Sequence, residues 1–178
     1  MKNSSKTALG GIIAALSLTL LFSVSIVPFF TYALPAAAAT LLIPLVIEVN
    51  KRWALGVYAG VSLLSFFIVP DKEVAVMYAA FFGYYVILKF SLESKFNKVI
   101  SWLFKCALFN ISALISYFLM IRFMGIELDE LEKFGMVAIP ILLALGTFAF
   151  VLYDIALTRV IYYYLARWRK HILKLIKF

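Results

Sequence analysis

The sequence has few of the residues that carry catalytic or metal chemistry. It contains one cysteine, Cys106, and one histidine, His171, so an internal disulfide is impossible and a metal site would have to rely on carboxylates. No Gly-rich phosphate loop ending in Gly-Lys-Ser/Thr is present, and the chain is too short for an added nucleotide-hydrolysing domain. The serines of the apolar stretches have no histidine beside them, so we identify no catalytic residue. We expect a protein that is not an enzyme and has no metal or other cofactor.

Charge is also scarce. Only 15% of the residues are charged, 65% are hydrophobic, and the mean hydropathy is +1.03. Soluble domains are about half apolar and about a quarter charged, so this composition indicates a membrane protein. A spanning helix needs about 20 apolar residues. The 178 residues therefore allow one all-α transmembrane domain, a compact bundle of six helices with short loops.

Six apolar stretches predict the spanning helices, approximately at residues 8–30, 32–48, 53–69, 74–88, 99–123 and 137–162. The first stretch is longer than the ~7–15 apolar residues of a signal peptide, so we expect it to be a helix that is kept. Residues 163–178 form a basic amphipathic tail. We expect this tail to lie on anionic lipid, with contact to a cytoplasmic partner as the alternative.

The segment PDKE interrupts the apolar sequence at Pro70–Glu73. Each charge at the centre of a spanning helix costs about 2.5–3.5 kcal/mol, so the segment must be a turn at a membrane surface. Pro70 is expected to end one helix, while Asp71 caps the next helix and Glu73 lies in its first turn. Lys72 has no such local role in this prediction.

Basic residues are distributed unevenly between the two sets of predicted loops. Three of the seventeen, Lys72, Arg122 and Lys133, fall on the side of the PDKE turn, and the remaining fourteen fall on the other side. Lys89 and Lys105 are counted among these fourteen. The positive-inside rule then places both termini in the cytoplasm of a multi-pass cell-membrane protein. The net charge of +8 thus follows from membrane topology, and we expect no nucleic-acid partner.

Two acids lie within or next to predicted helices. Asp154 is about 17 residues into the last helix, or about 26 Å along it, near the cytoplasmic surface. We expect an ion pair with Arg159 or other nearby basic groups, with catalysis or proton coupling as the alternative. Glu48 is expected to pair with Arg52 at i+4.

Aromatic and polar residues in the outer half suggest a small-molecule cleft, with core packing as the alternative. Tyr78, Phe82 and Tyr85 are expected to share one face of the fourth helix, and Asn110 and Tyr117 one face of the fifth. The expected substrate-binding residues are Tyr32, Asp71, Lys72, Glu73, Tyr78, Phe82, Tyr85, Asn110 and Tyr117. In this hypothesis the charged PDKE turn forms a lid over stacked aromatic rings.

Small residues recur at i,i+4 spacing on two helices. The first helix contains the pairs Gly10/Ala14 and Gly11/Ala15, and the third contains Gly56 and Gly60. Such residues let helix backbones approach closely in lipid. They predict either packing within the bundle or a docking stripe for another membrane subunit.

With these features, the chain resembles the substrate-binding S components of energy-coupling factor (ECF) vitamin transporters. The resemblance covers essentially the whole chain and is carried by KTALGGIIAALSL, VIEVNKRWALGVYAG, PDKE and FFGYYVILK. It implies that Gly11 and Ala15, or in the other register Gly10 and Ala14, meet a transmembrane coupling subunit driven by two ATPases. It also implies capture of a small micronutrient between the outer loops and helices four to six. The alternative is a non-transport scaffold similar to the rod-shape-determining MreD family.

Overall fold

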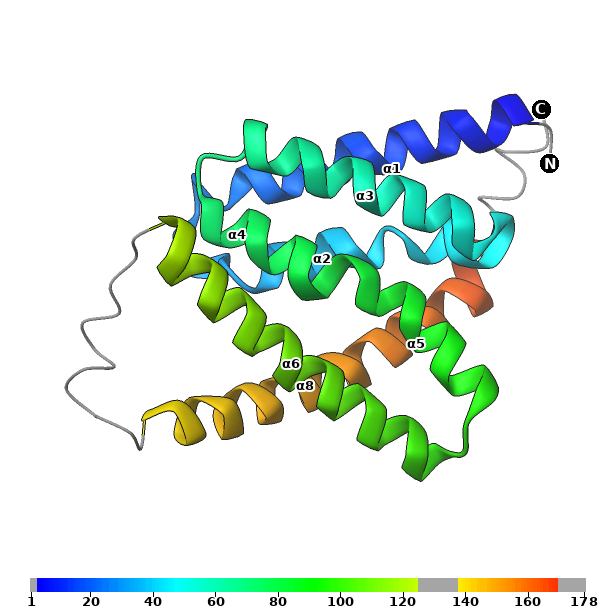
Figure 1. The fold of residues 1–178 in the computed structure, drawn as a ribbon. Coiled ribbons are helices and arrows are strands. Elements are labelled where there is room, and N and C mark those ends of the chain that lie inside the picture. The colour runs from blue at the N-terminus through cyan, green and yellow to red at the C-terminus, as the bar shows by residue number, and fades with distance from the viewer. Residues whose placement is uncertain (1–2, 125–137, 170–178) are drawn as a thin grey trace.

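The computed structural model describes residues 3–124 and 138–169 and is all-α, with no strand in these ranges (Figure 1). Six helical rods follow one another along the chain. Their elements are α1 (Asn3–Ser23), α2 (Ala33–Thr40) with η2 (Leu45–Val49), α3 (Lys51–Ile68), α4 (Lys72–Met77) with η3 (Tyr78–Phe82) and α5 (Gly83–Lys95), α6 (Lys98–Met124), and α8 (Ala138–Tyr163) with η5 (Tyr164–Trp168). A short 3-10 turn, η1 (Pro28–Phe30), lies between α1 and α2.

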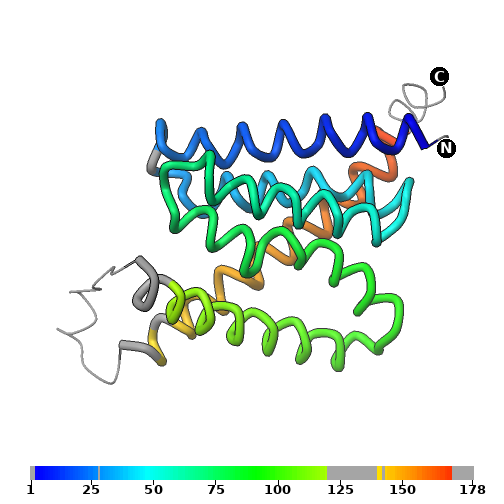
Figure 2. Tube along the Cα trace, turned by 45° about the horizontal axis from the view of Figure 1, so that its top comes forward, coloured from blue at the N-terminus to red at the C-terminus, as the bar shows by residue number. Residues whose placement is uncertain are grey.

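The rod formed by α4, η3 and α5 is central in the bundle. α1 packs against α2 and α3, the central rod contacts α2, α3 and α6, and α6 packs against α8. The start of α1 and the end of η5 lie at the same end of the bundle in both views (Figures 1 and 2). In Figure 1, α6 ends and α8 begins at the opposite end of the bundle.

Among the residues that the structure describes, four helical segments are long and apolar enough, by length and composition, to cross a membrane. They are Asn3–Ser23, Lys72–Lys95, Lys98–Leu119 and Leu143–Trp168. The segment Ala33–Val49 is apolar but shorter. Large apolar side chains such as Phe29, Phe67 and Phe118 are mostly exposed, as expected of groups that face lipid.

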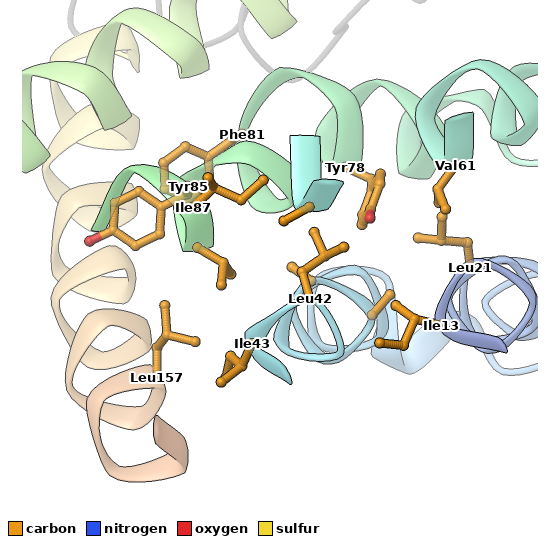
Figure 3. Packing of buried hydrophobic residues seen from close by; sticks show 14 of the residues in the cluster. Ile13, Leu21, Leu42, Ile43, Val61, Tyr78, Phe81, Tyr85, Ile87 and Leu157 are labelled. Atoms are coloured by element: carbon orange, nitrogen blue, oxygen red, sulfur yellow. The ribbon is translucent and has the colours of Figure 1, made fainter. Parts of the chain in front are cut away.

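The core is built around the second rod, which consists of α2 and η2. Leu42 and Ile43 are buried between Ile13 and Leu21 of α1 on one side and Leu157 of α8 on the other (Figure 3). These side chains are at most 5% exposed. The short rod therefore supplies the hydrophobic contact that joins the first half of the chain to the second.

Three predicted spans have different bounds in the structure. The predicted helix at 8–30 ends at Ser23 and is followed by turns, and the one at 32–48 is interrupted at residues 41–42, just before Pro44, which has no N–H to donate. The predicted span at 74–88 is too short, because the helix continues to Lys95. The prediction ended there because Lys89 was assigned to a loop, whereas the structure buries it inside the bundle.

The PDKE turn has the predicted caps. α3 ends at Ile68, α4 begins at Lys72, and the carboxylate of Asp71 accepts a hydrogen bond from the Glu73 N–H at 3.0 Å. The prediction that Lys72 has no local role is wrong. Its ammonium group donates to the carbonyl oxygens of Phe66 at 2.8 Å and Val69 at 2.9 Å, which places a cation at the C-terminal end of α3.

The central rod contains a π-helical segment, η3, which accepts a hydrogen bond from the side chain of Tyr58 in α3. The Tyr58 hydroxyl donates to the carbonyl oxygen of Ala79 at 2.5 Å. Its ring lies where a side chain at Gly83 would be, because a Cβ atom there would overlap Cδ2 and lie 2.6 Å from Cε2 of Tyr58. Glycine at position 83 thus permits close contact between α3 and the central rod.

We predict that Gly83→Ala destabilises the protein by about 1–3 kcal/mol, because the added methyl group displaces the Tyr58 ring. Gly60→Ala is the matched control, since a Cβ atom there meets no atom within 4 Å. Thermal unfolding of both purified variants, followed by tryptophan fluorescence, measures the difference. Equal midpoints for the two variants would contradict the proposed contact.

Candidate functional site

Three helices bring charged side chains together in the interior. Asp154 of α8 is 3% exposed, Lys89 of α5 is fully buried and Lys105 of α6 is 2% exposed. The ammonium group of Lys89 forms an ion pair with Oδ1 of Asp154, and that of Lys105 lies 3.2 Å from Oδ2. Each helix therefore contributes one charge to the same point.

Two further side chains complete this arrangement. The Tyr85 hydroxyl donates to Oδ1 of Asp154 at 2.5 Å. Oε1 of Glu93 lies 3.0 Å from the Lys89 ammonium and 2.5 Å from the Lys105 ammonium. We call Lys89, Glu93, Lys105 and Asp154 the ion cluster. Its two positive and two negative charges balance, which is the condition for placing them at this depth.

Loss of one member would leave the remaining three charges unbalanced, which is costly in a buried position. Asp154 accepts from groups on α5 and α6 while lying on α8 itself. The ion cluster therefore links α5, α6 and α8 and opposes sliding of these helices along one another, which apolar contacts alone would permit.

The predicted ion pairing of Asp154 is confirmed, and its partners are two other basic groups, Lys89 and Lys105, and not Arg159. Arg159 is exposed, because five residues along α8 correspond to about 140° around the helix. The assignment of Lys89 and Lys105 to inner loops is also wrong, since both are buried in helices. The sequence signal that could have revealed Lys89 is its i,i+4 spacing to both Tyr85 and Glu93.

Glu48 also has a different partner from the one predicted. Its Oε1 accepts from Nε of Arg169 at 2.9 Å, whereas the prediction paired it with Arg52 at i+4. Glu48 lies in η2, so its side chain does not follow the α-helical spacing that the prediction assumed. The contact joins η2 to the end of the last rod.

The aromatic residues of the central rod form a packed cluster next to the ion cluster. The Phe81 ring lies 5.0 Å from that of Tyr85, 5.2 Å from that of Phe109 and 5.7 Å from that of Phe150, measured between centroids. Phe82 meets Tyr153 edge-on at 5.4 Å. Phe81, which the sequence prediction did not select, is at the centre of these contacts.

The predicted substrate-binding residues occupy different parts of the structure. Tyr78 is buried beside Tyr58 at 6.1 Å between ring centroids, while the Tyr85 hydroxyl donates to Asp154 of the ion cluster. Figure 3 shows the hydroxyl groups of Tyr78 and Tyr85 pointing in different directions. The π-helical segment between them changes the rotation that the i,i+7 spacing assumed. Tyr85 also lies fourteen residues from Asp71, about 20 Å along the rod, so the two do not meet.

Asn110 and Tyr117 lie on α6. The Asn110 amide donates to the carbonyl oxygen of Cys106 at 2.8 Å and to Oγ1 of Thr147 at 3.3 Å, so it joins α6 to α8. Tyr117 is half-buried. Their role in binding a substrate stays a prediction.

Tyr32 and the PDKE turn lie at the other end of the central rod from the ion cluster. The Tyr32 side chain is 61% exposed. Partial burial, followed by the negative charge of Glu73, raises the pKa of Tyr32 above its usual range. The hypothesis that Tyr32 and the PDKE turn form a lid stays a prediction, and Lys72 is bound to the end of α3.

The two small-residue pairs of α1 have opposite environments. Gly10 is buried, and a Cβ atom there would lie 3.1 Å from Cγ2 of Val57 in α3, with Ala14 half-buried on the same side. Gly11 has no atom within 4 Å of such a Cβ atom, and Ala15 is exposed. The structure thus places Gly10/Ala14 inside the bundle and Gly11/Ala15 on its surface.

Within residues 3–124 and 138–169, no group of three histidine, cysteine, aspartate or glutamate side chains is arranged to hold a metal ion. No family model, curated protein or solved structure matches this chain.

We predict that Asp154→Asn destabilises the protein by about 3 kcal/mol or more, because Lys89 and Lys105 lose the buried charge that balances them. The matched control is Arg159→Ala, which removes the exposed residue that the sequence favoured as partner and should change stability by at most about 0.5 kcal/mol. Both are measured by unfolding of the purified protein. A larger effect of Arg159→Ala would refute the observed pairing.

Proposed function

We propose that this chain is the substrate-binding S component of an ECF-type importer in the cytoplasmic membrane. It would capture a small micronutrient outside and dock on a transmembrane coupling subunit that two ATPases drive. The observation that carries this proposal is the exposed pair Gly11/Ala15 on α1. Exposed glycine and alanine give a lipid-facing helix little apolar contact of its own, but they let a second helix approach closely.

A second pair of small residues extends the same kind of surface. Gly56 and Gly60 of α3 also have no neighbour within 4 Å of an added Cβ atom. α3 packs directly against α1. Two adjacent helices with open small-residue positions support docking of another membrane subunit rather than packing within this chain.

The proposed orientation has both termini in the cytoplasm. Lys89 and Lys105 are buried inside the bundle and Arg159 lies nine residues before the end of the last rod at Trp168, so these three are left out of the count of charges near helix ends. Even without them, eleven basic residues remain on the side of the termini and three on the side of the PDKE turn. This asymmetry supports the orientation under the positive-inside rule.

In this orientation the PDKE turn faces outward, and the micronutrient would enter from that end. The negative charge of Glu73, at the start of the central rod, contributes to the raised pKa of Tyr32. Phe82 and Tyr84, further along the rod, are only half-buried, and the exposed part of their rings would stack on a flat ring of the ligand. ATP hydrolysis would come from the partners, because this chain has no phosphate-binding loop.

The test compares Gly11→Leu and Ala15→Leu with Gly10→Leu, all co-expressed with a coupling subunit and ATPases from the same genome. The first two variants should remain folded and lose co-purification with the coupling subunit at least about tenfold, because leucine blocks close helix approach. Gly10→Leu should instead impair folding, since the position is occupied by Val57.

The proposal fails if Gly11→Leu and Ala15→Leu co-purify with the coupling subunit as well as the unaltered chain does. Co-purification with cell-wall synthesis proteins in place of the ATPases would favour the scaffold function.

A further inference from the structure

One oxygen atom of the ion cluster binds two buried ammonium groups. Oε1 of Glu93 lies 3.0 Å from Nζ of Lys89 and 2.5 Å from Nζ of Lys105. The lysine side chains are 0% and 3% exposed. Two cations fixed this close together require an anion between them.

The two acids of the cluster are held very differently. The Asp154 side chain is 5% exposed and accepts from Lys89, Lys105 and Tyr85, so it is fixed by groups on two other helices. The Glu93 side chain is 45% exposed and comes from the last turns of α5. Glu93 can therefore move toward solvent without disturbing the backbone, whereas Asp154 cannot.

The charge balance defines what could take the place of Glu93. Without its carboxylate, two lysines and one aspartate leave a single positive charge in the interior. The replacement must carry one negative charge and an oxygen that bridges two ammonium groups. Its apolar part must fit where the short Glu93 side chain lies. The carboxylate end of a small organic acid meets all of these conditions.

We propose that Lys89 and Lys105 form a binding site for the carboxylate of a small organic acid, which Glu93 occupies when no ligand is bound. The ligand displaces Glu93 to solvent, and Asp154 with Tyr85 keeps the two ammonium groups in place. This inference does not depend on the proposed transport function, because it rests on the contacts of the ion cluster alone. The tethered Glu93 competes with the ligand, so free acids bind the unaltered chain weakly.

The test uses acetate as the probe and the full chain in lipid nanodiscs. Glu93→Ala removes the tethered carboxylate and should lower the thermal midpoint by roughly 5–10 °C. Sodium acetate in the range of tens of millimolar should restore more than half of that loss, whereas sodium chloride at equal ionic strength should not. The unaltered chain should respond equally to the two salts, because Glu93 already fills the site.

The matched control is the double variant Glu93→Ala/Lys105→Met, which removes the unbalanced charge together with the second cation. Acetate should give this variant no more protection than chloride does. Equal protection of the single and double variants, or no acetate effect on Glu93→Ala, would overturn the proposal. If Glu93→Ala does not fold, Glu93→Gln is measured in the same two salts. A thermal midpoint of Glu93→Gln equal to that of the unaltered chain in both salts would overturn the proposal.

Discussion

The charge of Asp154 sets the strongest constraint in this bundle, because it lies at the contact of α5, α6 and α8 and must be balanced there. Lys89 and Lys105 supply the balance, Glu93 restores neutrality and Tyr85 orients the carboxylate. Apolar packing in a lipid environment tolerates sliding between helices. Charge pairing at one depth does not tolerate such sliding. The ion cluster therefore fixes the register of the helices in the second half of the chain.

In the first half of the chain, neighbouring helices are held together by close approach at two glycines. Gly10 brings α1 against Val57, and Gly83 brings the central rod against Tyr58. The outward position of Gly11 then follows, because adjacent residues of a helix cannot face the same neighbour. In this way internal packing leaves an open small-residue surface on α1, which the proposed docking function uses.

Local chemistry could be predicted from the sequence, whereas contacts between distant segments could not. Asp71 caps α4 as expected, because capping depends only on neighbouring residues. Lys89 was misplaced because a lysine in an apolar run ordinarily marks a loop, and its partner Asp154 is 65 residues away. The π-helical turn of η3 similarly altered the aromatic face, since no spacing rule identifies such a turn.

Removal of charge in pairs tests the central role of the ion cluster most directly. Asp154→Asn leaves an unbalanced positive charge in the interior and should be strongly destabilised, whereas the double variant Asp154→Asn/Lys105→Met leaves Lys89 paired with Glu93. A higher thermal midpoint for the double variant than for Asp154→Asn is the predicted result. A midpoint of the double variant equal to or below that of Asp154→Asn would contradict the account.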